Sequence, residues 1–308
     1  MKILITGVHG FVGSNLVVYL AKDNEIYGLD IIAPEKRGVV KTYSWDDLDA
    51  SIVPNVDAII HLAGKAHDTK NQSAADVYFK VNTELTKKIY DYYLKSKAKK
   101  FIFFSTAKAA ADKVEGILTE DVDPTPVGPY GESKIAAEKY IQEHLSDDKQ
   151  VYILRPCMIH GPGNKGNLNL LYGVVKKGIP WPLGAFKNRR TFTSIDNLCF
   201  VIGGLLTKDV PTGIYNMGDD EALSTNELIE EICKSLGKKA HIWKLPKGLM
   251  NGVAKIGGAL HLPLDTERLR KLTENYISSN EKIKKALGVE KMPVDAREGL
   301  KVTLESFK

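Results

Sequence analysis

Residues 2–13 read Lys-Ile-Leu-Ile-Thr-Gly-Val-His-Gly-Phe-Val-Gly, a short apolar run that meets glycines at Gly7, Gly10 and Gly13. The apolar run over 2–6 predicts a buried strand, and the periodic apolar residues over 11–21 predict a helix. Glycines between a strand and a helix let backbone N–H groups approach a pyrophosphate at the positive end of the helix. We therefore expect a dinucleotide site here. The residues expected to line it are Gly7, Gly10, Phe11, Val12 and Gly13.

A second predicted strand, over 26–29, ends on Asp30, 17 residues beyond Gly13. A carboxylate at this point can accept hydrogen bonds from both ribose hydroxyls, and it would repel a 2′-phosphate. Asp30 therefore favours NAD over NADP, although Lys36 and Arg37 follow closely and would soften that preference. The alternative interpretation of Asp30 is an acid that starts a turn.

The alternation of strand and helix continues through the first half of the chain. Apolar runs over 56–62, 101–104 and 151–154 predict further strands, with helices over 74–97 and 129–145 between them. Such a pattern predicts an α/β fold, a doubly wound parallel sheet of the Rossmann type. Ligands of these sheets bind at the carboxyl ends of the strands. The further residues expected there are Leu62, Ala63, Gly64, Ser105, Thr106, Arg155 and Pro156.

Beyond about residue 160 the alternation loosens. Residues 161–166 and 178–188 are rich in Gly, Pro and Asn, which is typical of loops around a short helix. Ser224 and Glu227 form a capping-box pattern that predicts a helix over 224–236. The expected division is a cofactor-binding domain over 1–163 and a smaller, mainly helical substrate lobe over 164–308, with segments such as 191–218 returning to the first domain.

Tyr130 and Lys134 lie four residues apart in a predicted helix, one turn apart on the same face. A free tyrosine titrates near ~10, too high for a good base at neutral pH. A nearby lysine cation and an oxidised nicotinamide ring would both favour the phenolate. The pair therefore predicts a proton-transfer centre beside a nicotinamide cofactor, with Lys134 also able to hold a ribose hydroxyl. The alternative interpretation is a pair of residues on a surface helix.

Two further polar residues have open roles. Thr106 either shares a hydrogen bond with the substrate oxygen on which Tyr130 acts, or caps the end of its strand. Asn82 is either a plain N-cap of its helical turn, or it fixes the backbone near the cofactor.

The bulk composition argues against several classes of protein. The net charge is +5 with lysines scattered among acids, so no nucleic-acid partner is expected. Cys157, Cys199 and Cys233 are isolated, which indicates a reducing cytoplasm and no metal site. The chain enters its first strand at once and has no run of 18 apolar residues. We therefore expect a cytoplasmic protein with no signal peptide and no membrane insertion.

Taken together, these motifs resemble the extended short-chain dehydrogenase/reductase family, in particular its NAD-dependent nucleotide-sugar epimerases and reductases. The segments that carry the resemblance are 6–13, Asp30, 61–64, Asn82, 105–106, 130–134, 154–156, 161–163, 167–168, 190–198 and 286–288. The resemblance implies a catalytic trio of Thr106, Tyr130 and Lys134. It also implies NAD as cofactor, a UDP-hexose as substrate, and a homodimer formed through helices 74–97 and 129–145.

The resemblance further implies that Asn167 and Arg190 contact the nucleotide diphosphate. An arginine fork suits a phosphate, and an asparagine offers both a donor and an acceptor. The alternative interpretation of Arg190 is a solvated loop cation beside Arg189.

The chain departs from the family at two points. Family dehydratases carry Asp-Glu directly after the catalytic threonine, whereas this chain has Ala107 and Lys108, so 4,6-dehydration is not expected. Many epimerases have asparagine where this chain has Met158, which leaves one diphosphate contact and the identity of the sugar open.

The leading interpretation is therefore NAD-dependent epimerisation at C4 of a UDP-linked hexose or N-acetylhexosamine, through a transient 4-keto intermediate. The alternative is an NAD(P)H-dependent 4-keto-reductase of a nucleotide-linked deoxysugar, which the region 272–288 also resembles. A non-enzymatic NAD-binding regulator would be expected to lose Tyr130 or Lys134, and this chain retains both.

Overall fold

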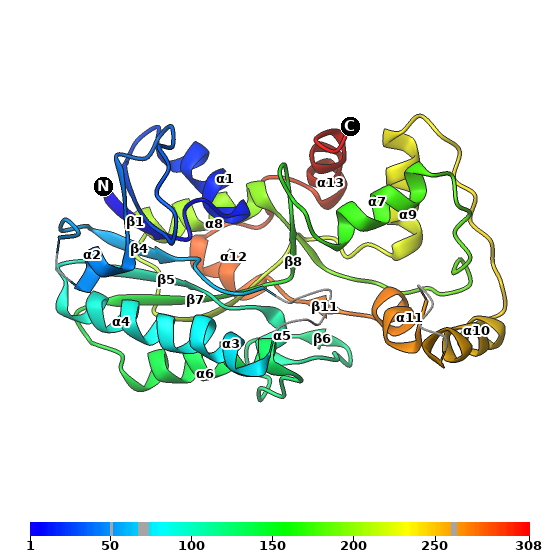
Figure 1. Cartoon of the computed structure of the whole chain (residues 1–308), viewed down its shortest axis with the longest axis horizontal. Helices are drawn as coiled ribbons and strands as arrows, with labels where there is room; N and C mark the ends of the chain where they lie inside the picture. The colour runs from blue at the N-terminus through cyan, green and yellow to red at the C-terminus, as the bar shows by residue number, and fades with distance from the viewer. Residues whose placement is uncertain (50–51, 67–73, 260–263) are drawn as a thin grey trace.

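A computed structural model describes residues 1–49, 52–66, 74–259 and 264–308 of the chain. Its largest feature is a parallel seven-stranded sheet with strand order β10-β7-β5-β4-β1-β2-β3 and helices on both faces (Figure 1). The strands are β1 (Lys2–Thr6), β2 (Glu25–Leu29), β3 (Lys41–Tyr43), β4 (Ala58–His61), β5 (Lys100–Phe104), β7 (Gln150–Pro156) and β10 (Gly213–Met217). The predicted doubly wound Rossmann-type fold is confirmed.

Both faces of the sheet are covered because neighbouring residues of each strand point to opposite sides. Ile3 and Ile5 of β1 pack with α1, α8 and α12, whereas Leu4 packs in a second core with α4 and α6. The bounds of these helices are Phe11–Leu20 for α1, Ile195–Thr207 for α8, Glu281–Leu287 for α12, Leu85–Lys95 for α4 and Pro129–Glu143 for α6. Burial on both faces explains why the strands read as uninterrupted apolar runs.

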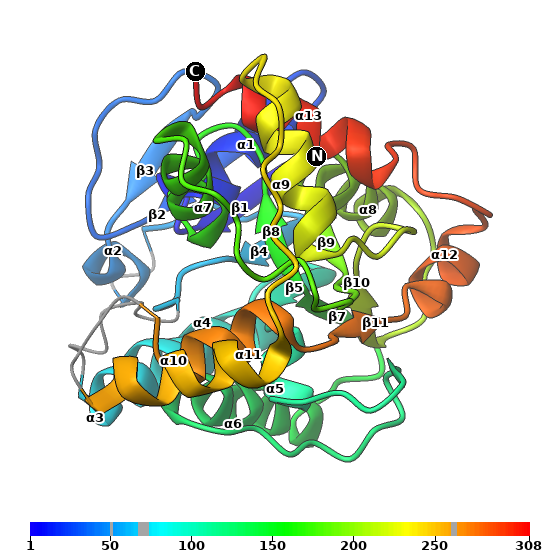
Figure 2. The same cartoon turned by 90° about the vertical axis from the view of Figure 1, so that its right-hand side faces the viewer.

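A third core belongs to a smaller, mainly helical lobe, which lies to the right of the sheet in Figure 1 and faces the viewer in Figure 2. Leu168, Leu228, Met250, Leu269 and Leu300 are among its buried members. The helices of the lobe are α7 (Asn167–Lys176), α9 (Thr225–Ser235), α10 (Lys247–Ala259), α11 (Thr266–Thr273) and α13 (Ala296–Glu305). The capping box of Ser224 and Glu227 is present at the start of α9, as predicted.

Short elements connect the sheet and the lobe. A short helix, α5 (Ala107–Ala110), follows β5, and a helix α2 (Trp45–Asp49) follows β3. Two small parallel pairs join distant parts of the chain. They are β8 (Met158–His160) with β9 (Phe192–Ser194), and β6 (Ile117–Leu118) with β11 (Ile277–Ser278).

The helix predicted over 74–97 is divided into three parts. An α-helical turn α3 (Ala75–Tyr78) leads into a π-helix η1 (Phe79–Glu84), and α4 follows it. π-Helical turns are rare and occur often at functional sites. Here the wider turn contains Asn82, whose side chain is fully buried.

Candidate active site

The glycine loop is packed so closely that side chains are excluded from it. Gly7 has φ +69°, and a Cβ on it would lie 2.9 Å from the backbone nitrogen of Ala63. A Cβ on Gly13 would lie 2.5 Å from the carbonyl oxygen of Gly7. The loop between β1 and α1 therefore presents bare backbone at the carboxyl edge of the sheet, which fits the pyrophosphate of a dinucleotide.

Asp30 connects the end of β2 to this loop. Its carboxylate accepts hydrogen bonds from the backbone N–H of His9 at 3.0 Å and of Ile31 at 2.8 Å. Asp30 is thus a turn residue and a neighbour of the glycine loop at once. Lys36 lies nearby and donates to Ser14 Oγ at 2.7 Å. Burial lowers the pKa of Lys36, and the carboxylate of Asp30 acts in the opposite direction.

Asn82 fixes the backbone that follows β4. Its Oδ1 accepts from the Lys65 N–H at 2.7 Å, and its Nδ2 donates to the Lys65 carbonyl at 3.1 Å and to Ser133 Oγ at 3.0 Å. The N-cap interpretation of Asn82 is therefore wrong, because the residue sits inside η1. Beside it, a Cβ on Gly64 would lie 3.0 Å from Asn82 Oδ1 and 3.1 Å from Lys134 Nζ.

Tyr130 and Thr106 meet at the carboxyl end of β5. Tyr130 is in the first turn of α6, and its phenol forms a hydrogen bond with the buried side chain of Thr106. Thr106 Oγ1 also accepts from the Lys108 N–H at 3.3 Å, so that it caps α5 as well. The ring of Tyr78 packs edge-on against Tyr130, with 6.4 Å between the ring centroids.

Lys134 lies behind Tyr130 in the same helix and is buried. Its ammonium donates to the Phe104 carbonyl at 2.8 Å and lies 5.0 Å from the centre of the Phe103 ring. Burial lowers the pKa of Lys134 to about 8, and the charge of Glu138 opposes that shift.

The pKa of Tyr130 in the chain alone is governed by burial. Burial raises this pKa, while the hydrogen bond with Thr106 opposes the rise. The lower pKa predicted from the sequence depends on a bound oxidised nicotinamide as well as on Lys134, and it stays a prediction for that complex. The chain alone therefore holds Tyr130 as a neutral phenol at neutral pH.

A buried ion pair underlies the site and was not predicted from the sequence. Arg155 of β7 donates from Nη2 to Glu138 Oε2 at 2.6 Å and from Nε to both carboxylate oxygens at 3.1 Å. Ser105 Oγ donates to the same carboxylate. The available signal was the position of Glu138, four residues after Lys134 on the same helix face.

A second buried chain of polar groups also escaped sequence reasoning. His61 Nδ1 lies 2.7 Å from Thr6 Oγ1, and His61 Nε2 lies 3.0 Å from Thr86 Oγ1. Burial, followed by the charge of Lys134, holds the pKa of His61 well below its usual value. The neutral imidazole thus links β1, β4 and α4 beneath the loops at the carboxyl edge. The sequence feature that could have revealed this buried chain is a histidine at the end of an otherwise apolar strand.

The predicted substrate contacts come from the lobe side. The guanidinium of Arg190 is largely buried and donates to the Lys271 carbonyl of α11. Burial lowers the pKa of Arg190, so the solvated-cation interpretation is wrong. Asn167 is exposed at the first residue of α7. Among the described residues, no cluster of His, Cys, Asp and Glu that could hold a metal ion is found.

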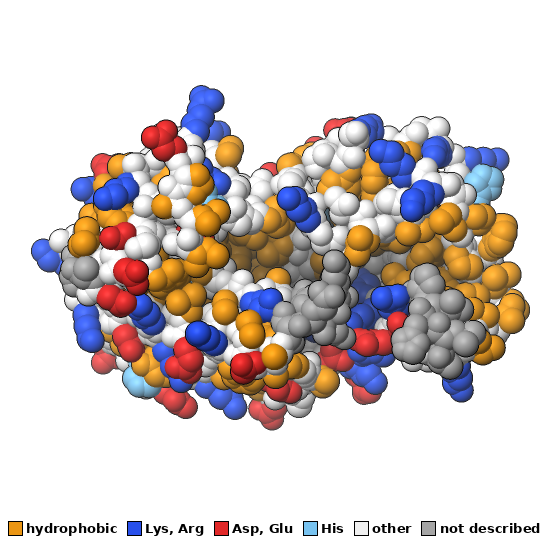
Figure 3. Space-filling model, viewed as in Figure 1, with side chains coloured by type: hydrophobic (Ala, Val, Ile, Leu, Met, Phe, Trp, Pro, Cys, Tyr) orange, Lys and Arg blue, Asp and Glu red, His pale blue; other side chains and the backbone are white. Residues whose placement is uncertain are grey.

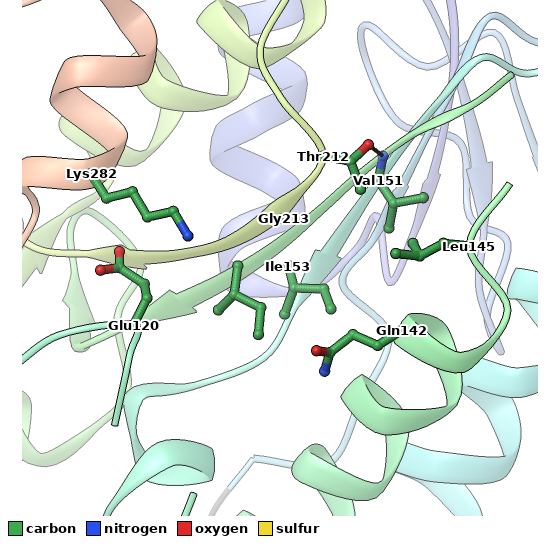
Figure 4. Close-up of a pocket in the computed structure, with 9 residues that line it drawn as sticks. Glu120, Gln142, Leu145, Val151, Ile153, Thr212, Gly213 and Lys282 are labelled. Atoms are coloured by element: carbon green, nitrogen blue, oxygen red, sulfur yellow. Dashed lines mark hydrogen bonds between the residues drawn. The ribbon is translucent and has the colours of Figure 1, made fainter. Parts of the chain in front are cut away.

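The space-filling view shows a hollow between the sheet and the lobe (Figure 3). A different hollow, of about 230 Å³, is lined by Gln142 and Leu145 at the end of α6 and by Val151, Ile153 and Gly213 of the sheet (Figure 4). Val151 and Gly213 lie at the amino ends of β7 and β10. This second hollow is therefore remote from Thr106 and Tyr130, and it is not the candidate active site.

Comparison with known proteins gives consistent matches. The model of the NAD dependent epimerase/dehydratase family matches residues 3–218. A UDP-glucose 4-epimerase of Vibrio cholerae is 32% identical, with 99% of this chain and 95% of that protein aligned. An N-acetyl-alpha-D-glucosaminyl-diphospho-ditrans,octacis-undecaprenol 4-epimerase of Escherichia coli O157:H7 is 28% identical, over 82% of this chain and 78% of that protein. The solved structure of MoeE5 in complex with UDP-glucose and NAD aligns with a TM-score of 0.78 at 20% identity, over 99% of this chain and 98% of that one.

Proposed function

This chain belongs to the NAD-dependent epimerase/dehydratase family, and we propose that it epimerises C4 of a UDP-linked hexose or N-acetylhexosamine through a transient 4-keto sugar. The observation that carries the proposal is the buried contact of Tyr130 with Thr106 at the carboxyl end of β5, with Lys134 directly behind it. A phenol in this position can exchange a proton with a sugar hydroxyl that is held by the threonine.

In the proposed mechanism, Tyr130 takes the proton of the C4 hydroxyl and later returns it to the oxygen at C4. Thr106 holds that oxygen by a hydrogen bond. Because burial keeps the phenol of Tyr130 neutral in the chain alone, the positive charge that favours its ionisation has to come with the cofactor. The nicotinamide of bound NAD supplies both the acceptor and the donor of the C4 hydride.

The cofactor is assigned to residues 1–163 and the sugar nucleotide to residues 164–308 together with the catalytic trio. Asp30 is proposed to accept hydrogen bonds from the ribose hydroxyls of the adenosine half of NAD. The buried Lys134 is proposed to hold the ribose of the nicotinamide half. The remaining proposed cofactor contacts are Gly7, Gly10, Phe11, Val12, Gly13, Leu62, Ala63, Gly64, Asn82, Ser105, Tyr130 and Pro156.

Arg190 and Asn167 are proposed to contact the diphosphate of the substrate. The two relatives described above both act on a sugar attached to a diphosphate. In one the diphosphate is linked to a nucleoside, and in the other it is linked to a polyprenol. The largely buried guanidinium of Arg190 suits the shared diphosphate, since charge-assisted bonds to phosphate are strong away from water.

We further propose that the protein is cytoplasmic and forms a homodimer through the outer faces of α4 and α6. These helices pack side by side on one face of the sheet, below it in Figure 1. Light scattering during size-exclusion chromatography tests the assembly, and a protein that elutes as a monomer at all concentrations would contradict it.

The function is tested by incubating the purified protein with UDP-glucose, UDP-N-acetylglucosamine and N-acetylglucosaminyl-diphospho-undecaprenol, without added cofactor. Formation of the C4 epimer of a UDP-sugar is the expected result. Turnover that requires a 4-keto sugar and one equivalent of NADH per product would contradict the epimerase proposal and favour a 4-keto-reductase.

A further inference from the structure

The end of the lobe that is farthest from the sheet has an unusual distribution of charge. Residues 232–264 contain six lysines and not one aspartate or glutamate, in a chain that has 38 acidic residues. This stretch includes the end of α9, the connecting segment and all of α10. Among the described lysines of this stretch, Lys244, Lys247 and Lys255 are exposed around α10.

Helix α10 has two apolar faces. Met250 and Ala254 point into the core of the lobe and are buried. Leu249, Val253 and Ile256 repeat at intervals of four and three residues along a second face, about a third of a turn around the helix from the first, where they are 54%, 43% and 60% exposed. The inward face explains why the helix forms, whereas the outward row is left exposed by the part of the chain that the structure describes.

Trp243 extends the exposed apolar surface beyond the helix. It precedes α10, is 54% exposed, and is fixed by a backbone hydrogen bond to Trp181 at 2.8 Å. The segment that carries Trp243 and the helix α10 together form the outer end of the lobe, which faces the viewer in Figure 2. Hydrophobic side chains gather along the corresponding right-hand edge of the space-filling view (Figure 3).

Acidic residues of the adjacent helix do not neutralise the lysines. Glu267 of α11 pairs with Lys271 at 2.5 Å, and Asp265 lies 3.6 Å from Arg268. The outer end of the lobe therefore combines a row of apolar side chains, an exposed tryptophan and an excess of positive charge. This combination is typical of helices that lie in the interface of an anionic membrane.

We propose that this surface docks the protein on the face of a lipid bilayer that contains anionic phospholipids. The membrane-docking face consists of Trp243, Leu249, Val253 and Ile256, and Lys247 and Lys255 lie on the polar side of the same helix. The apolar row would enter the boundary between headgroups and acyl chains, and the lysines would pair with phosphates. No helix in the described ranges is long and apolar enough to cross a membrane, so the contact is peripheral.

A second copy of the chain fits this surface less well. A second copy carries the same excess of lysine over residues 232–264, so two such surfaces would repel each other. An anionic bilayer offers the opposite charge.

Docking would also bring the candidate substrate site close to the membrane. α10 packs against α11, whose Lys271 carbonyl accepts the hydrogen bond from Arg190. The proposal itself depends on the surface alone and not on the sugar that the enzyme uses.

The test is flotation of the whole chain with vesicles of pure phosphatidylcholine and with vesicles in which about 30% of the lipid is anionic phosphatidylglycerol. Binding is expected only to the anionic vesicles, and it should weaken as salt increases. Reversal of charge in Lys247→Glu and Lys255→Glu should each reduce partitioning about fivefold or more. Leu249→Ser with Ile256→Ser should abolish insertion.

Val18→Ser is the matched control, because Val18 is 73% exposed on α1 at the other end of the molecule. It should leave vesicle binding unchanged. A shift of the Trp243 emission to shorter wavelength on binding, absent in Trp243→Phe, would independently place this residue in the bilayer interface.

The proposal is overturned if the wild-type protein stays with the buffer at low salt, or if the variants and Val18→Ser bind alike. It is also overturned if the α10 variants convert a dimer into a monomer and leave vesicle binding unchanged. That result would assign the surface to a second copy.

Discussion

Two opposing effects act on the pKa of Tyr130. Burial raises the pKa of its phenol, and the hydrogen bond with Thr106 lowers it. The phenol is therefore neutral at neutral pH in the chain alone. We propose that the positive charge of a bound oxidised nicotinamide favours its ionisation.

Replacement of Tyr130 by phenylalanine tests the role of its hydroxyl. Tyr130→Phe removes the proton acceptor but keeps the ring, so kcat should fall by about 10²- to 10⁴-fold while NAD remains bound. Tyr140→Phe, on the same helix, is the matched control, since the Tyr140 hydroxyl donates to Asp91 at 2.6 Å away from the site. Product formation followed by chromatography measures both, and a Tyr130→Phe enzyme as active as Tyr140→Phe would refute the role.

Burial of Lys134 has a cost to stability that depends on pH. The pKa of this lysine falls from 10.5 to about 8 on folding, so the folded protein binds fewer protons than the unfolded chain between these values. Stability from this group therefore increases as pH rises through that window. Lys134→Met should be more stable than wild type by about 3 kcal/mol at pH 7, with the difference falling to about 1 kcal/mol or less by pH 10.

Urea denaturation at the two pH values measures this difference, and Lys139→Met, exposed on the same helix, is the control. An advantage of Lys134→Met that is the same at pH 7 and pH 10 would contradict the account. The variant should lose activity in spite of its stability, as is common when a buried charge serves function.

At the scale of elements, the junction of β1 and α1 admits no side chain. A Cβ on Gly13 would lie within 3 Å of the backbone of both Gly7 and Val8. Gly13→Ala should therefore distort the loop and abolish retention of NAD by the purified protein. Gly173→Ala is the matched control, because nothing lies within 4 Å of a Cβ at that position of α7. Absorbance and chromatography of released cofactor measure the effect, and full NAD occupancy in Gly13→Ala would contradict it.

The contact between α6 and β7 rests on the buried pair of Glu138 and Arg155. Glu138→Ala leaves the guanidinium uncompensated and should reduce the free energy of unfolding by about 3–5 kcal/mol. The double variant Glu138→Met with Arg155→Met should recover most of that loss, because two apolar side chains can replace a buried pair. Urea denaturation measures the change, and Glu143→Ala, at an exposed position of the same helix, is the control. A decrease in the free energy of unfolding of less than about 1 kcal/mol in Glu138→Ala would contradict a stabilising role of the pair.

Prediction from sequence was most accurate where local patterns decide the structure. The first strand was predicted with its observed bounds, Lys2–Thr6, and the capping box of α9 was also recognised. The π-helical turn around Asn82 was not predicted, because one wider turn does not visibly change the spacing of the apolar residues. Arg155 was expected at the ligand-binding edge of the sheet, but its buried pairing with Glu138 was missed. Charged residues are ordinarily exposed, and only distant neighbours show that these two are buried.

At the scale of the whole molecule, ion pairs join the sheet-bearing part to the lobe. Asp112, after α5, pairs with Lys108 at 2.9 Å and with Arg270 of α11 at 3.0 Å. Lys108 occupies a position where dehydratases of the family carry an acid, and here it is held by Asp112. That this enzyme does not carry out 4,6-dehydration stays a prediction.

The central claim is that the hydride removed from C4 returns to the same sugar. It is tested most directly with a UDP-hexose deuterated at C4, incubated with the purified protein without added cofactor and followed by NMR and mass spectrometry. The account predicts a C4 epimer that retains deuterium at C4. Deuterium found in free nicotinamide cofactor, or product formed only from a 4-keto sugar with added NADH, would contradict it.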